Sequence, residues 1–258
     1  STTYGTSPSY SAGGMTVSYC TDCASGNSSP NIVTISGASI SVSGSTVTVV
    51  NGNTTAVFGL SPANPVMNSS GTQLTVGSYS LGASNTAITT SPVNATPNFN
   101  AVTVAGGLTV LPLTLAYADL GVTGISQVYN GSVNMSNLSL TTASGFIAGD
   151  SVTASATGTF AAKNVGSNIA YTIGVSLSGS DAANYQMSSG SSYSGTNGAI
   201  TQLSSVTYTG SNAGGNWSNP SNWTTTGTST VGAIPDLSNV ATVIIPAGST
   251  VIYDAAVA

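Results

Sequence analysis

Apolar and polar residues alternate along much of the chain. In residues 31–58, NIVTISGASISVSGSTVTVVNGNTTAVF, the residues Val, Ile and Phe alternate with Ser and Thr. Successive side chains of a β-strand point to opposite faces, so this period gives each strand one apolar face and one hydroxyl-bearing face. Glycines and an Asn-Gly pair interrupt the alternation, as reversals of the chain require. The pattern predicts antiparallel strands joined by hairpins.

Strong helix formers are scarce in this chain. It contains no Glu, no Arg and a single lysine, Lys163. Since these residue types fill the exposed faces of most helices, long helices are not expected. The sequence predicts an all-β fold with at most a helical turn near Ala182 and Ala183.

Two segments of the chain end alike. Residues 91–112 and 179–201 each carry an Asn followed by an aromatic residue, then a Gly-rich turn and a closing strand. Such repetition is typical of a module present twice. It predicts tandem antiparallel β-sandwich domains of the immunoglobulin-like kind over residues 1–114 and 115–205.

The Asn-aromatic pair in each of these two segments is expected to have a structural role. Asn98 and Asn184 are expected to cap a tight connection, because short amide side chains bind nearby backbone groups. Phe99 and Tyr185 are expected to fill the end of each core.

The third region, residues 206–258, differs from the two modules. It carries both tryptophans in turns rich in Asn, Ser and Gly, followed by short strand patterns around Pro246. Its last strand pattern, Thr250, Val251, Ile252 and Tyr253, has no obvious partner in the chain. We expect it to pair with another molecule or to continue into a longer solenoid or stalk.

Charge is nearly absent from the composition. Charged residues make up 3% of the chain, against about 25% in ordinary soluble domains, and the formal net charge is −5. A single cation cannot neutralise nucleic-acid phosphates, so nucleic acid is not expected as a partner. No apolar run approaches the roughly 18 residues of a membrane span. The composition favours an extracellular or cell-surface protein.

The inventory of side chains also argues against an enzyme. There is no histidine to act as a base for a serine nucleophile, and none of the six aspartates is near another in sequence. The lone Lys163 suggests either an isopeptide bond of the kind found in some bacterial surface domains or a solvated strand charge that discourages edge pairing.

Cys20 and Cys23 have the spacing of a C-x-x-C motif. A zinc site would need two further soft ligands, and the chain has no other Cys and no His. A redox motif would need a helix N-terminus to lower the thiol pKa, whereas the surroundings read as a loop. The preferred interpretation is a small disulfide ring at a hairpin tip.

Asp150 and Asp181 are the candidate metal ligands. Carboxylates in turns can hold Ca²⁺ in extracellular modules. Each of these residues stands alone, however, without a second carboxylate at the D-x-D spacing. Turn capping is the alternative role, and no other cofactor is indicated.

Trp217 and Trp223 are the candidate sugar-binding residues. Aromatic faces flanked by amides can stack on sugar rings. The alternative is that both rings cap the end of a β-layer.

Two motif sets resemble known modules of bacterial adhesins. VYNGS at 128–132, with FIAGDSVTASATGTFAAKNVGSNIAYTIGVSLSGSDAANYQM at 146–187, resembles the YDG-type repeat of large secreted filamentous-haemagglutinin-like adhesins. Asn130 stands where that repeat usually has Asp. TTYGTSPSYSA, LTVGSYSL and NFNAVTVAGGLTVLPLTL, within residues 1–115, resemble the related MBG module, with Phe99 replacing the more frequent Tyr.

The resemblance implies a secreted or surface-tethered bacterial protein that serves attachment or biofilm matrix. Together with the composition, it predicts a non-enzymatic adhesin or matrix protein that pairs strands with other copies of itself, in the strongest version as a filament. The alternative is a carbohydrate-binding module of a larger secreted protein, with host or bacterial surface glycans as partners.

Overall fold

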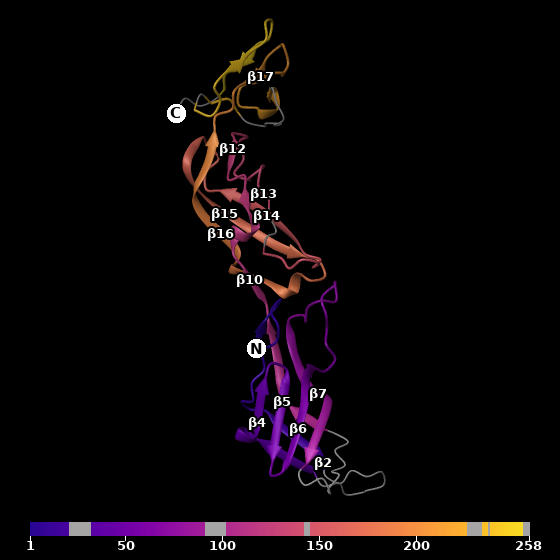
Figure 1. Ribbon diagram of the computed structural model, residues 1–258. Helices are drawn as coiled ribbons and strands as arrows, with labels where there is room; N and C mark the ends of the chain where they lie inside the picture. Colours follow the sequence, from indigo (N-terminus) through magenta and orange to yellow (C-terminus); the bar gives the residue numbers. More distant parts are fainter. Residues whose placement is uncertain (21–31, 91–101, 142–144, 226–233, 237, 255–258) are drawn as a thin grey trace. The chain divides into compact units, whose positions relative to one another are not determined.

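The computed structural model describes residues 1–20, 32–90, 102–141, 145–225, 234–236 and 238–254 (Figure 1). Strands dominate this part of the chain. Its helical structure is limited to 3-10 turns of three or four residues: η1 (Gly37–Ser39), η2 (Tyr117–Leu120), η3 (Ala182–Asn184) and η4 (Pro220–Asn222). The expected all-β class and the expected turn near Ala182 are confirmed. In the same described part, no helix has the length and apolar character needed to cross a bilayer.

The chain forms two compact units. Unit 1 comprises Ser1–Thr114 together with two short later segments, Ile147–Ser151 and Gly179–Gln186. Unit 2 comprises Leu115–Phe146, Val152–Ser178 and Met187–Ala258. The C-terminal region therefore belongs to the same unit as the strands of the second module.

Two sheets build unit 1. The six-stranded sheet has the order β1-β9-β7-β6-β5-β4, and the three-stranded sheet has the order β3-β2-β8. The strands are β1 (Thr2–Thr3), β2 (Thr16–Cys20), β3 (Ile32–Ser36), β4 (Ile40–Ser43), β5 (Thr46–Asn51), β6 (Thr54–Pro62), β7 (Gly77–Thr90), β8 (Val102–Ala105) and β9 (Gly107–Leu111). All pairs are antiparallel except β1 with β9.

The hairpins predicted for residues 31–58 are present. Strands β4, β5 and β6 lie side by side in Figure 1 and pair in sequence order. Alternate residues of β5 and β6, such as Val47, Val49 and Phe58, are buried, while Thr46 and Thr48, beside the two valines, are more exposed. Gly52, with φ at +57°, makes the reversal between β5 and β6. Period-two alternation therefore specified both the strands and their buried face.

The main sheet of unit 2 has the order β10-β16-β15-β14, and β12 also pairs with β16. Smaller sheets are formed by β11 with β13, by β19-β17-β20 and by β18 with β21. The strands are β10 (Leu113–Leu115), β11 (Val122–Thr123), β12 (Ser126–Val128), β13 (Ser139–Leu140), β14 (Thr153–Phe160), β15 (Gly166–Ser178), β16 (Tyr185–Thr201), β17 (Val206–Tyr208), β18 (Gly215–Asn216), β19 (Trp223–Thr225), β20 (Val243–Ile244) and β21 (Val251–Ile252).

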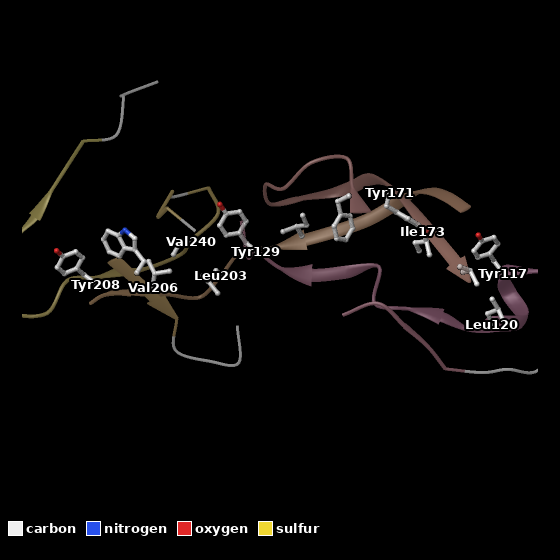
Figure 2. Packing of buried hydrophobic residues seen from close by; sticks show 13 residues of the cluster. Tyr117, Leu120, Tyr129, Tyr171, Ile173, Leu203, Val206, Tyr208 and Val240 are labelled. Atoms are coloured by element: carbon white, nitrogen blue, oxygen red, sulfur yellow. The ribbon is translucent and has the colours of Figure 1, made fainter. Parts of the chain in front are cut away.

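One hydrophobic cluster runs through unit 2 (Figure 2). It continues from Tyr117 and Ile173, beside the main sheet, to Tyr129 and on to Val206 and Tyr208 in the C-terminal region. A buried amide reinforces this connection, because the Asn239 side chain accepts the backbone N–H of Val165 at 2.8 Å. Shared apolar burial explains why the C-terminal region is not a separate unit.

Both units contain the same arrangement, a short parallel strand followed by a buried tyrosine. The first strand of unit 1, β1, runs parallel to β9, and β12 in unit 2 runs parallel to β16. In each case a buried tyrosine follows the strand and donates its backbone N–H to the partner strand: Tyr4 to Leu111 and Tyr129 to Thr201, both at 2.8 Å. The repetition expected from residues 91–112 and 179–201 thus has a counterpart at their closing strands. Asn98 and Phe99 lie outside the described residues.

The C-terminal region contains two stacked parallel stretches. Leu203 lies opposite Val240, Val206 opposite Val243 and Gly215 opposite Val251, which are register offsets of 37, 37 and 36 residues. The nearly constant offset means that residues 240–252 repeat the course of residues 203–216. Their strand pattern therefore has a partner inside the chain.

Replacing Ile173 by alanine should destabilise unit 2 by about 2–5 kcal/mol, because the side chain is fully buried and a cavity would remain. Both tryptophans lie in unit 2, so urea unfolding followed by tryptophan fluorescence reports on this unit. Ile244→Ala, at a position 42% exposed, is the matched control and should cost about 0.5 kcal/mol. Equal losses in the two variants would contradict the assignment of the core.

Candidate functional site

Asp150 is held by three donors in unit 1. Its Oδ2 accepts the hydroxyl of Tyr4 at 2.7 Å and also the hydroxyl of Tyr185. Its Oδ1 accepts the side-chain amide of Asn68 at 2.5 Å. The rings of Tyr4 and Tyr185 meet edge to face with centroids 5.5 Å apart. One carboxylate thus joins residues that are far apart in the sequence.

Asp181 lies in a second, similar setting of unit 1 and is 2% exposed. Its Oδ1 accepts the backbone N–H of Ser69 at 2.9 Å. Its Oδ2 accepts the backbone N–H of Ser151 at 2.8 Å and the hydroxyl of Ser69. The hydroxyl of Ser69 and the N–H groups favour the ionised form, so they lower the pKa of this carboxyl group.

These contacts favour hydrogen-bonded carboxylates over a calcium site. Among the residues that the structure describes, the six groups that hydrogen-bond to the two carboxylates are donors, whereas a cation needs converging acceptors. Within the described residues, no group of three or more Asp, Glu, His or Cys side chains converges to hold a metal. The contacts are also longer in range than the turn-capping bonds suggested by the sequence, since they span 82 and 112 residues.

Asn184 and Tyr185, from the motif that the sequence repeats, are both buried in unit 1. The side-chain oxygen of Asn184 accepts the backbone N–H of Val76 at 2.9 Å. Burial, and then the hydrogen bond to Asp150, raise the pKa of Tyr185, and the same two causes raise the pKa of Tyr4. Both phenols therefore remain protonated donors at neutral pH.

The two tryptophans have different environments. Trp223 is 2% exposed, and its indole N–H donates to the backbone oxygen of Trp217 at 2.9 Å. Its ring has no free face, so stacking on a sugar is wrong as a role for Trp223 in this structure. Trp217 is half-buried, and its indole N–H donates to the backbone oxygen of Pro235 at 3.0 Å.

Tyr253 extends this aromatic group to the surface. It is 61% exposed, and its ring centroid lies 5.5 Å from that of Trp217. The neighbouring Asp254 accepts the backbone N–H of Ser218 at 2.8 Å and its hydroxyl at 2.6 Å. Sequence reasoning placed Tyr253 in a strand and missed its ring contact with Trp217, because the two residues lie 36 positions apart.

The strand expected at Thr250–Tyr253 has a partner in its own chain, which corrects the expectation that it lacks one. Val251 and Ile252 form β21, which pairs in parallel with β18. Ile252 and Tyr253 remain 52% and 61% exposed. Along β20 and β21, residues 238–253 carry no charged side chain among those the structure describes.

Two further predictions concern the disulfide between Cys20 and Cys23 and the place of Lys163. Cys20 ends β2 opposite Ile32, whereas Cys23 lies outside the described residues, so the disulfide remains a prediction. Lys163 is exposed in the loop between β14 and β15. Lys163 is therefore not a strand residue, which corrects its expected place within a strand.

Comparison with known proteins identifies one module. The sequence profile of the YDG domain matches residues 112–193, so a YDG domain is found in this range. The match confirms the YDG-type part of the resemblance. No curated protein and no solved structure matched the chain.

Unit 1 should lose stability in acid through Asp181. Because folding lowers the pKa of this group, its contribution is complete above the ordinary value of about 3.9 and is lost as pH falls through the folded value. Asp181→Asn should therefore lower stability at pH 7 and flatten the loss between pH 5 and pH 2. Hydrogen exchange of peptides from unit 1, measured over a urea series at each pH, reports both effects for this unit alone. Asp254→Asn, in unit 2, should leave the acid profile of unit 1 unchanged.

Proposed function

We propose that the protein is a non-enzymatic bacterial adhesin or biofilm-matrix protein that acts outside the cell and binds other copies of itself through strand edges. The near absence of charge supports this proposal, because surface contacts then depend on hydroxyl, amide and backbone groups. The YDG domain at residues 112–193 is consistent with it. We also propose that the two units are tandem sandwich modules of a filamentous-haemagglutinin-like protein, with unit 1 of the MBG type.

The outer edge of the C-terminal region carries the proposal. Soluble proteins protect exposed strand edges with charges, bulges or covering loops. Within the described residues, β20 and β21 each pair with a strand on one side only. These strands and the residues directly after them expose large apolar side chains: Ile244 at 42%, Ile245 at 45%, Ile252 at 52% and Tyr253 at 61%. Such an edge is suited to accept a strand from another molecule.

The pairing of β17 restricts the kind of assembly that this edge can form. β17 lies between β19 and β20, so its two sides are already occupied. If a second copy meets β20 and β21 with its own β20 and β21, both sides use the same edge, and the contact closes a two-fold dimer. In an antiparallel arrangement centred on Ile252, Asp254 would face Thr250 and not the Asp254 of the other copy. A filament requires a second edge, and β4 at the end of the six-stranded sheet is the uncharged candidate.

Adding a charge at the C-terminal edge should weaken self-association. Ile252→Lys places an ammonium group where strand pairing would bury it, so we expect the dissociation constant to rise at least about tenfold. Sedimentation velocity over a concentration series measures this change. Val66→Lys, at a loop position 59% exposed, adds the same charge elsewhere and should leave association unchanged. A wild-type protein that stays monomeric at all concentrations would contradict the proposal.

A carbohydrate-binding module is the second candidate, and the exposed ring of Tyr253 on Trp217 favours it. The exposed tyrosine ring, tilted by 59° against the indole of Trp217, offers an aromatic face for a neutral sugar. The carboxylate oxygens of Asp254 keep lone pairs free for sugar hydroxyl groups after binding Ser218.

If this second function holds, Tyr253→Ala should abolish binding to a neutral glycan that is retained on an array. Tyr253→Phe should retain most of it, because the stacking face remains. Ile252→Ala is the neighbouring control. Binding that survives Tyr253→Ala, or an array without any bound glycan, would remove this candidate.

A further inference from the structure

The continuous part of unit 1, residues 1–114, starts with a strand that is parallel to the strand near its end. Thr2 pairs with Val110, and Thr3 pairs with Leu111. β9 is followed directly by β10 and by the boundary at Thr114. A pull applied at residues 1 and 114 therefore moves β1 and β9 in opposite directions along their common axis. Their hydrogen bonds bear this load together and do not open one after another from an end.

The backbone contacts of β1 are few, because the strand has only two residues. Its extension at Tyr4 adds one N–H bond to Leu111 at 2.8 Å. A strand this short would slide easily if it depended on backbone pairing alone.

Tyr4 supplies the missing resistance. Its side chain is 1% exposed, and its hydroxyl donates to the carboxylate of Asp150 at 2.7 Å. The same carboxylate is held by Tyr185 and Asn68, so a load on Tyr4 is shared by three other segments of unit 1. Hydrogen bonds to ionised groups are stronger than neutral ones, and burial keeps water from replacing them.

We propose that unit 1 is a load-bearing clamp, in which β1 and β9 are loaded in shear and the Tyr4–Asp150–Tyr185 cluster locks β1 in place. The inference rests on the proposed adhesive function, because an adhesin or matrix protein works under tension. It also assigns a role to Asp150 and Tyr185, which the sequence motif alone could not give. Unit 2 repeats the parallel closure with β12, Tyr129 and β16.

The pulling direction gives the first test, on single molecules of the full chain. Handles at residues 1 and 114 load β1 and β9 in shear, whereas handles at residues 1 and 106 peel the two strands apart from one end. All three positions are exposed, so a bio-orthogonal side chain can be introduced there. We expect the force that unfolds unit 1 to be at least about twofold higher in shear at the same loading rate. Equal forces in the two directions would overturn the clamp.

The side-chain lock gives the second test. In the shear geometry, Tyr4→Phe should raise the unfolding rate at constant force at least about tenfold, because a bond to a carboxylate is lost. Tyr10→Phe removes a hydroxyl from the same N-terminal segment outside the β1–β9 pair and should have no such effect. An unchanged rate for Tyr4→Phe would overturn the lock.

Two features keep these outcomes interpretable. If Tyr4→Phe does not fold, the clamp can still be tested by comparing the two pulling directions in protein that keeps Tyr4. Since single molecules are pulled, the result does not depend on self-association. Failure of the clamp and failure of the proposed function are therefore distinguishable.

Discussion

Hydrogen bonding without cations is the constraint on which this structure depends. With one lysine and no arginine, carboxylates cannot be neutralised by ion pairs in the usual way. Serine takes over this task, because one serine offers its backbone N–H and its hydroxyl to the same carboxylate. Three aspartates are held in this manner: Asp181 by Ser69, Asp236 by Ser238 and Asp254 by Ser218. In each case these bonds lower the pKa of the carboxyl group.

The same chemistry covers the outer faces of the sheets. Hydroxyl groups meet across neighbouring strands, as between Ser155 and Ser176 at 2.8 Å and between Ser18 and Thr34 at 2.7 Å. The two hydroxyl groups of such a pair meet each other's hydrogen-bonding needs without charge. They provide no electrostatic repulsion against an approaching surface. A surface of this kind is wetted by water and offers no electrostatic barrier to a second surface like it. The composition thus connects the fold to association.

Local patterns predicted the local structure well. Alternation in residues 31–58 specified strands and hairpins because the side-chain period of a strand is two, and the turn at Ala182 followed from the residues beside it. The contacts of Asp150 with Tyr4 and Asn68 were not predictable, because they span 146 and 82 residues and no local pattern encodes such a distance. The partner of β21 was missed for the same reason. Parallel pairing at an offset of 36 residues leaves no hairpin signal.

A protein that adheres under tension needs both an open strand edge for binding and a fixed strand for bearing load, and in unit 1 these two roles fall on different strands. An edge that binds another molecule must be open, whereas a strand that carries tension must be fixed on its neighbour. In the six-stranded sheet, β1 at one end is fixed by the Tyr4 cluster, and β4 at the other end is paired only with β5 within the described sheet. Pairing at β4 would leave the load path through β1 and β9 untouched. A sheet arranged in this way can add a partner at β4 without weakening the pairing of β1 with β9.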